Sequence, residues 1–265
     1  MNLFLIPMKL CEKWNKLSKQ IIDNQNILVL NEMSWDSEFF DCSAYSLDTA
    51  LTKLENPIQD SNILSKELKR SFITVKLPTN VSSLYLANLF VYGFNYIDTE
   101  VILRFDNRKV MLETTPFEIK ELIVNKDIPY HELGSMFTSS RFHNDVNISS
   151  IKANILWIEY LKNFKPSKER KMFVAYDNAS IIGVILVNIT DQRCATLFYV
   201  SILKEYQGQG AGKLLINHVL AYLTDNKITE IRTETQIKNI NALNFYIKNG
   251  FTTIEKTLTV LHRWE

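Results

Sequence analysis

The chain has 265 residues, of which 46% are hydrophobic and 22% are charged, and its formal net charge is +1. This hydrophobic content is sufficient for a substantial core and excludes an intrinsically disordered chain. The balanced charge argues against a general nucleic-acid-binding protein, because such proteins neutralise many phosphates with Lys and Arg. A chain of this length suits one large domain or two small ones.

The cysteines, histidines and first residues bear on the compartment and on metals. Cys11, Cys42 and Cys194 are odd in number and widely spaced, so we expect reduced thiols rather than a disulfide framework. The four histidines have no metal-ligand spacing, and we expect no metal site. The apolar start lacks a basic region and is interrupted by Pro7, so it does not predict a signal peptide. No apolar run is long enough to span a membrane, and we expect a cytoplasmic protein.

The first part of the chain is expected to hold a helical extension, residues 1–26, and a small α/β lobe, residues 27–110. Apolar residues recur at helical spacing over residues 8–23, which predicts a helix there. The lobe alternates strand-like runs with one helix that ends at a glycine. Its expected elements are strands at 26–30, 43–47 and 71–77, a helix at 81–91 ending at Gly93, a strand at 94–105, and a turn or linker at 106–109.

The second part, residues 111–265, is expected to be a larger α/β domain. Pro129 suits the first turn of a helix, and residues 139–142, Ser-Ser-Arg-Phe, are expected to break that helix. The other expected elements are strands at 117–124, 172–176, 181–189, 195–202, 231–237 and 252–264, a helix at 150–164, and helices that begin near Leu214 and Asn239.

Residues 206–213, Tyr-Gln-Gly-Gln-Gly-Ala-Gly-Lys, lie between the apolar run at 195–202 and an apolar-periodic segment that begins at Leu214. This order predicts a glycine-rich turn between a strand and a helix. Glycine lets backbone N–H groups approach a ligand without obstruction by Cβ, and a helix N-terminus adds unpaired donors and a positive dipole. The turn therefore favours a phosphate group. The alternative is a helix N-terminus whose small residues serve close packing.

A second motif runs from Asn239 through Ala242 and Tyr246 to Gly250-Phe251. Its apolar residues lie on one face of a helix, and Gly250 fits the left-handed position that ends it. The glycine turn is neither a Walker loop nor a dinucleotide fingerprint. The two motifs together resemble the Q/R-x-x-G-x-G/A and N-x-x-A-x-x-x-Y-x-x-x-G-F signatures of the GCN5-related N-acetyltransferase (GNAT) superfamily. The resemblance covers residues 115–265.

The resemblance implies a GNAT fold with a mixed central sheet, preceded by a smaller, partial GNAT-like lobe. It implies acetyl-CoA as cosubstrate, with its pyrophosphate held by the glycine loop and an oxyanion stabilised by a backbone N–H of the preceding strand. Asn239 is expected to bind the pantetheine arm or to cap its helix, and the two roles are compatible. The implied cofactor-binding residues are Val200, Ser201, Ile202, Gln207, Gly208, Gln209, Gly210, Ala211, Gly212, Lys213, Asn239 and Tyr246.

A closer resemblance concerns the acceptor. Residues 34–40 (Ser-Trp-Asp-Ser-Glu-Phe-Phe), 93–100, 140–142 and 235–247 are similar to segments of the dTDP-fucosamine acetyltransferase family, which acetylates an amino group of a dTDP-linked amino sugar. Two of these segments lie outside the superfamily signatures, which favours a shared acceptor. We therefore expect a nucleotide-linked amino sugar as the small-molecule partner, and the prediction allows for a homodimer. The aromatic side chains Trp35, Phe39 and Phe40 either line the acceptor pocket or belong to the core.

Acyl transfer from a thioester to an amine needs a neutral amine, a donor to the oxyanion and a proton for the departing thiolate. The resemblance makes Tyr246 the candidate acid; the alternative is a core tyrosine with a satisfied hydroxyl. Asp98 and Glu100, two apart on one strand, are candidate bases, or else form a solvated acidic face. Arg141 is expected to bind a phosphate or a sugar hydroxyl, or to form a helix-end ion pair.

Two other functions stay open at this point. One is a GNAT enzyme that acts on a protein, peptide or antibiotic amine, and the other is a coenzyme A-binding module without activity. Helices ending in Gly-Phe precede strands at Gly93 and at Gly250, which is either an echo between the two lobes or a coincidence. Because the first lobe has no glycine loop, we expect one cofactor site and a first lobe that shapes the acceptor pocket.

Overall fold

The computed structural model describes residues 18–23, 25–56, 58, 61–106 and 116–265. The chain forms two compact units: the first runs up to Thr99 and includes Leu258–Glu265, and the second is Glu100–Thr257. Two strands, β5 (Asn95–Arg104) and β11 (Thr253–Trp264), contribute residues to both units. The expected domain boundary near residue 110 lies outside the described residues, and the division at 26 and 110 stays a prediction.

The first unit is a mixed sheet with three short helices. Its further elements are β1 (Ser18–Asp23), β2 (Asn26–Glu32), α1 (Ser34–Phe40), β3 (Ser43–Leu47), α2 (Ile63–Glu67), β4 (Ser71–Pro78) and α3 (Ser83–Val91). Strands β1, β2 and β3 pair antiparallel in sequence order, β3 pairs with β4 in parallel, and β4 pairs with β11 antiparallel. A core of buried aliphatic and aromatic side chains lies between this sheet and its helices.

The helix predicted over residues 8–23 is wrong where the structure describes it, because Ser18–Asp23 forms strand β1. Ile21 is 3% exposed and the adjacent Ile22 is 62% exposed, which is the alternation of a strand with one buried face. Pairing with β2 overrides the helical spacing of the apolar residues. The rest of the predicted helix lies outside the described residues. Helices α1 and α2 were not predicted, because elements this short carry too few apolar repeats to show a period.

The second unit is also a mixed sheet, in the order β5-β10-β9-β8-β7-β6. Only β9 and β10 pair in parallel; the other neighbours are antiparallel. The mixed central sheet predicted from the resemblance is therefore present. The further elements are β6 (Glu118–Leu122), α4 (Tyr130–Ser135), α5 (Ser150–Lys162), β7 (Arg170–Asp177), β8 (Ser180–Ile189), β9 (Cys194–Ile202), α6 (Ala211–Asp225), β10 (Glu230–Gln236) and α7 (Ile240–Lys248).

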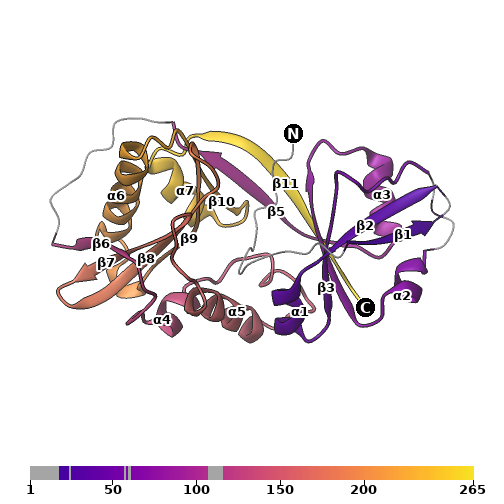
Figure 1. Ribbon diagram of the computed structural model, residues 1–265, viewed down its shortest axis with the longest axis horizontal. Coiled ribbons are helices and arrows are strands. Elements are labelled where there is room, and N and C mark those ends of the chain that lie inside the picture. The colour runs from indigo at the N-terminus through magenta and orange to yellow at the C-terminus, as the bar shows by residue number, and fades with distance from the viewer. Residues whose placement is uncertain (1–17, 24, 57, 59–60, 107–115) are drawn as a thin grey trace. The chain divides into compact units, whose positions relative to one another are not determined.

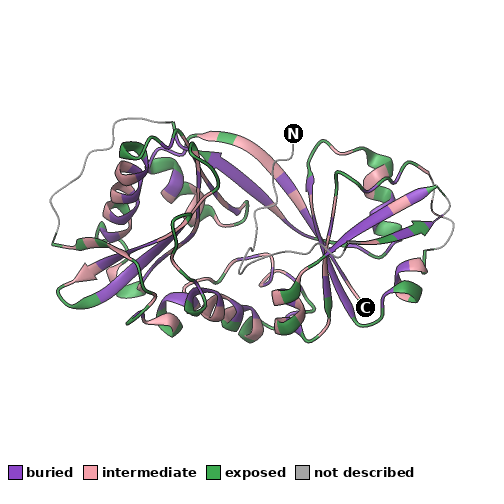
Figure 2. Cartoon of the chain, viewed as in Figure 1, coloured by how far each residue is buried: buried purple, intermediate pink, exposed green. Residues whose placement is uncertain are grey.

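Helices cover both faces of this sheet. Helix α6 packs on one face, and α4 and α5 lie along the other (Figure 1). Strand β8 is buried along most of its length, and the inward side of α6 is buried with it (Figure 2). The strand and helix positions predicted from the second part of the sequence are confirmed to within a few residues. Helix α4 begins at Tyr130, so Pro129 is its N-cap rather than part of its first turn.

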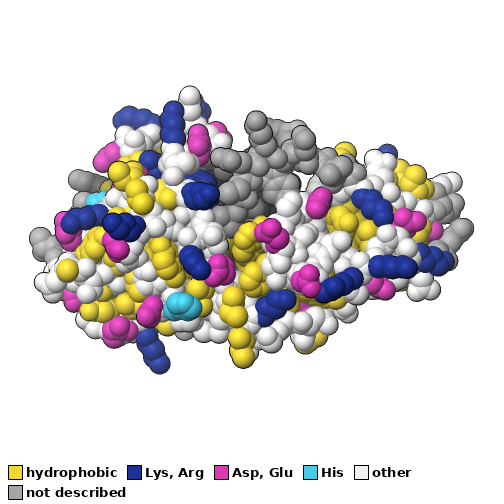
Figure 3. All heavy atoms as spheres, turned by 60° about the horizontal axis from the view of Figure 1, so that its bottom comes forward, with side chains coloured by type: hydrophobic (Ala, Val, Ile, Leu, Met, Phe, Trp, Pro, Cys, Tyr) yellow, Lys and Arg dark blue, Asp and Glu magenta, His cyan; other side chains and the backbone are white. Residues whose placement is uncertain are grey.

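The exposed charges, the helix lengths and the side chains of metal-binding residue types bear on the expectations from the sequence. On the face shown in Figure 3, basic and acidic side chains are interspersed with small hydrophobic areas. None of the helices in the described ranges is long and apolar enough to cross a membrane. Within those same ranges, no group of three or more His, Cys, Asp and Glu side chains is placed to hold a metal ion.

Candidate cofactor and catalytic site

The glycine-rich stretch connects β9 to α6, as predicted. A 3-10 turn at Lys204–Tyr206 leads into Gly208 and Gly210, whose φ angles are +78° and +88°. Glycine adopts such angles without a steric penalty, and a Cβ at either position would meet nothing within 4 Å. Gly210 is the N-cap of α6 and supplies no side-chain cap, so the first N–H groups of the helix are left for a ligand. This is the geometry of an anion site.

Gly212 has a different role from the two loop glycines. A Cβ there would lie 3.3 Å from Cε2 of Phe245 and 3.5 Å from Cγ1 of Ile202. The missing side chain therefore lets α6 pack closely against α7 and β9. For this residue the structure shows the packing alternative, so the motif combines an open loop with a tight helix contact.

Three side-chain hydrogen bonds hold the loop in shape. Gln207 Nε2 donates to the Ile202 carbonyl at 2.9 Å, and Gln209 Nε2 donates to the Glu205 carbonyl at 2.5 Å. Tyr206 Oη donates to Asp177 Oδ2 at 3.1 Å, which ties the loop to the turn between β7 and β8. Gln207 Nε2 also lies 3.9 Å from Met136 Sδ, and the predicted contacts of Gln207 to Lys213 with a cofactor stay a prediction.

Strands β9 and β10 separate next to this loop. Their parallel pairing runs from Cys194 to Leu197 on β9 and ends at Thr233 on β10. The pairing of β9 with β8 shifts by one residue at the same level, which leaves Phe198 as the extra residue of a β-bulge. Beyond this level β9 stays paired with β8, and β10 stays paired with β5. An opening between two parallel strands results.

The hydrogen-bond alternation fixes which β9 backbone groups face the opening. Leu203 N–H donates to the Ile182 carbonyl at 2.9 Å, so every second residue of β9 directs its polar groups to β8. Ser201 belongs to that set, and its buried hydroxyl also donates to the Leu133 carbonyl at 2.8 Å. Val200 and Ile202 point the other way. Of the three predicted donors, the Ser201 N–H is therefore directed to β8, and the Val200 and Ile202 N–H groups are directed away from it.

Tyr246 lies on the inner side of α7, close to the point where the strands separate. Its ring packs edge-on against Phe245 and Phe251, and its side chain is 7% exposed. Burial raises the pKa of Tyr246 to about 12, although the Thr233 hydroxyl beside it favours the ionised form. Thr233 is the last paired residue of β10, which places the tyrosine hydroxyl at the end of the β9–β10 ladder.

Glu234 is a residue that the sequence reasoning missed. It follows Thr233 directly, so it is the first β10 residue beyond the ladder. Burial is the main reason that the pKa of Tyr246 and that of Tyr160 are raised, and the charge of Glu234 adds to both shifts. In the sequence it is one polar residue of an alternating strand. The end of the β9–β10 ladder distinguishes it, and that end coincides with the bulge.

Aromatic side chains line the sheet face that carries α4 and α5. The bulge turns two consecutive residues, Phe198 and Tyr199, toward Tyr160, at centroid distances of 5.8 and 6.4 Å. Phe137 stacks on Trp157 at 4.6 Å. The indole of Trp157 also donates to Ser140 Oγ at 3.2 Å. These contacts fix the segment between α4 and α5.

Arg141 follows Ser140 in this segment. Ser140 Oγ and His143 Nδ1 share a hydrogen bond of 2.8 Å, and His143 Nε2 bonds Asn154 Oδ1 at 2.9 Å. The guanidinium of Arg141 lies 4.6 Å from the centre of the Phe142 ring. The segment that carries Arg141 is therefore tied to α5.

The predicted acidic pair on β5 is buried. Asp98 is 0% exposed and Glu100 is 3% exposed, so the alternative of a solvated acidic face is wrong. Asp98 Oδ1 accepts from the Thr99 N–H at 2.7 Å in the first unit. In the second unit Glu100 lies opposite Gln236 of β10, three residues past Thr233.

Two further predicted features have structural roles. Asn239 Oδ1 accepts from the Ala242 N–H at 3.1 Å, so the asparagine caps α7. In the first unit Phe40 is buried against Phe72 and Trp264, which makes it a core residue. Trp35 stacks on the half-buried Phe39 at 5.3 Å, and whether these two rings meet an acceptor stays a prediction.

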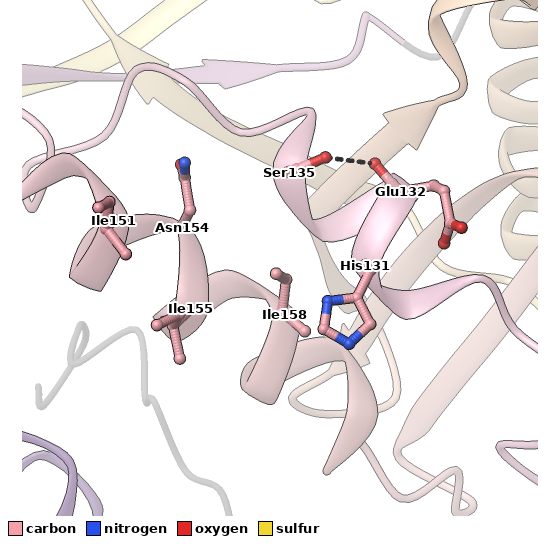
Figure 4. A pocket seen from close by; sticks show the side chains of 7 residues that line it. All are labelled: His131, Glu132, Ser135, Ile151, Asn154, Ile155 and Ile158. Carbon is pink, nitrogen blue, oxygen red and sulfur yellow. Dashed lines mark hydrogen bonds between the residues drawn. The ribbon is translucent and has the colours of Figure 1, made fainter.

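A hollow of about 440 Å³ lies apart from these residues, on the outer side of α4 and α5 (Figure 4). Ile151, Ile155 and Ile158 form its apolar wall, with His131 and Glu132 at the other side. None of the predicted site residues lines it. The hollow is therefore a surface feature of the helix pair, separate from the opening between β9 and β10.

The comparisons with known proteins concern the part of the chain that holds these residues. Residues 137–251 match the acetyltransferase (GNAT) family. The acetyltransferase PseH of Campylobacter jejuni is 28% identical over 128 residues, which are 46% of this chain and 78% of that protein. The spore coat polysaccharide biosynthesis protein SpsD of Bacillus subtilis is 27% identical over 132 residues, 48% of this chain and 44% of that protein. N-alpha-acetyltransferase 30 of Schizosaccharomyces pombe is 35% identical over 83 residues, 30% of this chain and 55% of that protein.

Solved structures agree in fold. A tandem GNAT protein from the clavulanic acid biosynthesis pathway superposes with a TM-score of 0.57 at 12% identity, covering 90% of this chain and 78% of that protein. At this identity the likeness concerns the fold alone. The family match spans the segment after α4, the glycine loop and Tyr246. The chain therefore carries a GNAT-family N-acetyltransferase domain, and acetyl-CoA is its cosubstrate.

Proposed function

We propose that this protein moves the acetyl group of acetyl-CoA to the amino group of a nucleotide-linked amino sugar, by direct attack in a ternary complex. The observation that carries the transfer chemistry is the opening between β9 and β10, which adjoins the glycine loop at one end and Tyr246 at the other. The sugar acceptor is supported by the likeness to SpsD, named for polysaccharide biosynthesis, and by the sequence segments outside the GNAT signatures.

In this proposal the loop holds the cofactor by its backbone. The N–H groups from Gly208 to Lys213 bind the pyrophosphate at the positive end of α6. The pantetheine arm enters between the separated strands, where edge groups of β9 are left without a ladder partner from β10. The Val200 N–H then donates to the oxyanion that forms when the amine attacks the thioester.

Tyr246 supplies a hydrogen bond to the departing sulfur. Its pKa of about 12 lies about 3.5 units above that of a free thiol, so full transfer of the proton is uphill by about 5 kcal/mol. That is about 3 kcal/mol more than for a tyrosine in water. The tyrosine therefore acts mainly by hydrogen bonding to the developing thiolate, and transfers its proton late.

The base that deprotonates the amine is a carboxylate. Asp98 and Glu100 are the candidates from the sequence, and both are buried on β5. Glu234 joins them on geometry, since it is the first β10 residue beyond the last pair with β9. Arg141 is proposed to bind the phosphates of the acceptor. The first lobe is proposed to shape the acceptor pocket.

A second acceptor class is favoured by a different likeness. N-alpha-acetyltransferase 30 acts, by its name, on α-amino groups, and it is 35% identical over the 83 residues it shares with this chain. The match to N-alpha-acetyltransferase 30 covers 30% of this chain, whereas the match to SpsD covers 48%. A match of the smaller size is explained by a cofactor that the two proteins share. With the sugar acceptor we also propose a cytoplasmic location and allow for a homodimer.

A panel of acceptors tests the proposal. The chain is incubated with acetyl-CoA and, separately, with dTDP- and UDP-linked amino sugars, peptides with free N-termini and streptothricin, and thiol release is recorded. We expect release above background with nucleotide amino sugars alone, and Tyr246→Phe as the matched inactive control. Turnover restricted to peptides or to the antibiotic would replace the sugar proposal. If none of the acceptors in the panel gives thiol release above background, the proposal is rejected.

A further inference from the structure

We infer that Gly183 of β8 is a positioning residue for the cofactor, because it leaves the space in which the Ile202 side chain supports the start of α6. Ile202 is the last residue of β9, is buried, and lies directly opposite Gly183 in the β8–β9 ladder. The inference rests on the proposed binding of the pyrophosphate at the glycine loop, and it adds a residue outside that loop on which the binding depends.

Gly183 and Ile202 form a non-hydrogen-bonded pair of the antiparallel ladder. The Leu203 N–H donates to the Ile182 carbonyl at 2.9 Å, and this bond lies beside the pair. Side chains of neighbouring strands approach most closely at pairs of this kind. A Cβ at Gly183 would lie 2.3 Å from Ile202 Cδ1 and 3.1 Å from the Ser201 carbonyl oxygen. Glycine therefore lets the isoleucine lie across β8.

Helix α6 packs on the other side of the same isoleucine. A Cβ at Gly212, in the first turn of α6, would lie 3.5 Å from Ile202 Cγ1 and 3.3 Å from Phe245 Cε2. Ile202 thus lies between a glycine of β8 and a glycine of α6. Protein interiors are close-packed and transmit strain, so a displacement of Ile202 away from β8 is passed to the first turn of the helix. The N–H groups of that turn are the ones proposed to bind the pyrophosphate.

The backbone of Ile202 is tied to the loop as well. Its polar groups point away from β8, and its carbonyl accepts from Gln207 Nε2 at 2.9 Å. Moving Ile202 therefore also moves one of the hydrogen bonds that shape the loop. Gly183 acts on the loop through Ile202, so it is a positioning residue and not a ligand of the cofactor.

The close approach defines a pair of substitutions that should compensate each other. Gly183→Ala adds the methyl group that meets Ile202 Cδ1, and Ile202→Val removes that same atom. The double variant has the added methyl group without this collision. Ile231→Val is the matched control, because Ile231 is a buried isoleucine of the same core and loses the same methyl group.

Calorimetry with CoA, at a temperature where each variant is folded, measures the effect without an acceptor. We expect Gly183→Ala to bind CoA about tenfold more weakly, since overpacking displaces neighbouring groups. Adding Ile202→Val should restore the Kd to within about threefold of the native value, and Ile202→Val or Ile231→Val alone should stay within about twofold. A merely structural role of Gly183 would lower the melting temperature and leave the Kd of the folded chain unchanged.

An unchanged Kd in Gly183→Ala, or a loss that Ile202→Val does not reverse, would overturn the inference. An equal loss in Ile231→Val would also overturn it, because the effect would then belong to the whole core. If Gly183→Ala alone does not fold, the double variant decides: it must fold and bind CoA with near-native affinity. A wrong sugar acceptor leaves these results untouched, whereas a native chain that fails to bind CoA would reject the proposed function itself.

Discussion

The two units end a helix in the same way, and only one of them carries the chemistry. In the second unit the Phe251 N–H donates to the Tyr246 carbonyl at 3.0 Å and the Gly250 N–H donates to Ile247 at 3.1 Å. In the first unit Phe94 donates to Leu89 at 3.0 Å and Gly93 donates to Phe90 at 2.9 Å. Both are Schellman motifs with a left-handed glycine. The match therefore extends beyond the Gly-Phe pair seen in the sequence.

The strands repeat the same frame. In the first unit two antiparallel pairs are followed by one parallel pair and another antiparallel pair. The second unit has the same order from β7 to β5, with the further antiparallel pair β6–β7 before it. The last strand of the frame, β11 or β5, also has residues in the other unit. The differences are local. Where the second unit has the glycine loop and the 15-residue α6, the first has the 5-residue α2. Strand β3 pairs with β4 over Ser43–Ser46, nearly its whole length, whereas β9 leaves β10 at Leu197.

One side chain completes the contrast. Tyr246 lies four residues before Gly250, the glycine that ends α7. Four residues before Gly93, the corresponding residue of the first unit is Leu89, which is 0% exposed. Three differences thus distinguish the unit to which we assign the cofactor: a loop with a long helix, an opening between parallel strands, and a hydroxyl in place of an aliphatic side chain. Each difference is open to a separate test.

The largest effect is expected from Tyr246→Phe. The substitution keeps the ring that packs on Phe245 and Phe251 and removes the group that hydrogen-bonds the leaving sulfur. We expect kcat to fall by about 10²–10⁴-fold with little change in KM for acetyl-CoA. Steady-state kinetics with thiol detection measures this, beside a thermal melt. Tyr222→Phe, a half-buried tyrosine of α6 whose ring packs on Phe173 at 5.0 Å, is the control and should keep native turnover.

Normal turnover in Tyr246→Phe would remove the tyrosine from the mechanism. A low kcat with an unchanged melting temperature would support its role. The Leu89→Met variant of the first unit extends the comparison, because the same helix position there should affect stability alone.

Substitutions at two glycines with positive φ, one in each unit, should affect either CoA binding or folding stability. Gly210→Val places a β-branched residue at a φ of +88° and rearranges the loop, and we expect CoA to bind at least about tenfold more weakly. Gly93→Ala strains the corresponding helix end in the first unit, where φ is +85°, at a cost of about 1 kcal/mol of folding stability. Calorimetry with CoA and denaturant unfolding distinguish the two. Weakened CoA binding in Gly93→Ala alone would contradict the assignment of the cofactor to the second unit.

A smaller effect is expected at the hydrogen bond between Tyr206 and Asp177. Tyr206→Phe keeps the ring beside Phe117 and removes the bond that ties the loop to the β7–β8 turn. We expect CoA affinity to fall about threefold, because a half-exposed hydrogen bond contributes little net free energy. Asp177→Ala should match it, and the double variant should add nothing further. Additive losses would show that the two groups act independently.

The smallest effect concerns alkaline stability. An unfolded tyrosine ionises near pH 10, whereas burial raises the pKa of Tyr246 to about 12. Between these values the unfolded chain has lost a proton that the folded chain retains, so the stability present below pH 10 falls as the pH rises through about 12. Tyr246→Phe should show a shallower fall in urea unfolding over this range. An identical slope in both proteins would mean that the phenol is not held neutral by the fold.

The sequence predicted the second unit better than the first, and the reason is physical. Long buried strands such as β8 and the 15-residue α6 show clear periods, and the loop glycines have a backbone reason to be glycine. Strand β1 was mistaken for a helix because its partner β2 is not visible in local spacing. The loop and Tyr246 follow from motifs. The end of the β9–β10 ladder, and with it the place of Glu234, coincides with a bulge that no local sequence pattern predicts.

A crystal structure of this chain with CoA tests the central claim most directly. The account predicts the pyrophosphate on the N–H groups that follow Gly208, the pantetheine arm between β9 and β10, and the sulfur within hydrogen-bond reach of the Tyr246 hydroxyl and near the Val200 N–H. CoA bound elsewhere on the chain, or a sulfur far from Tyr246 with β9 and β10 closed, would contradict it.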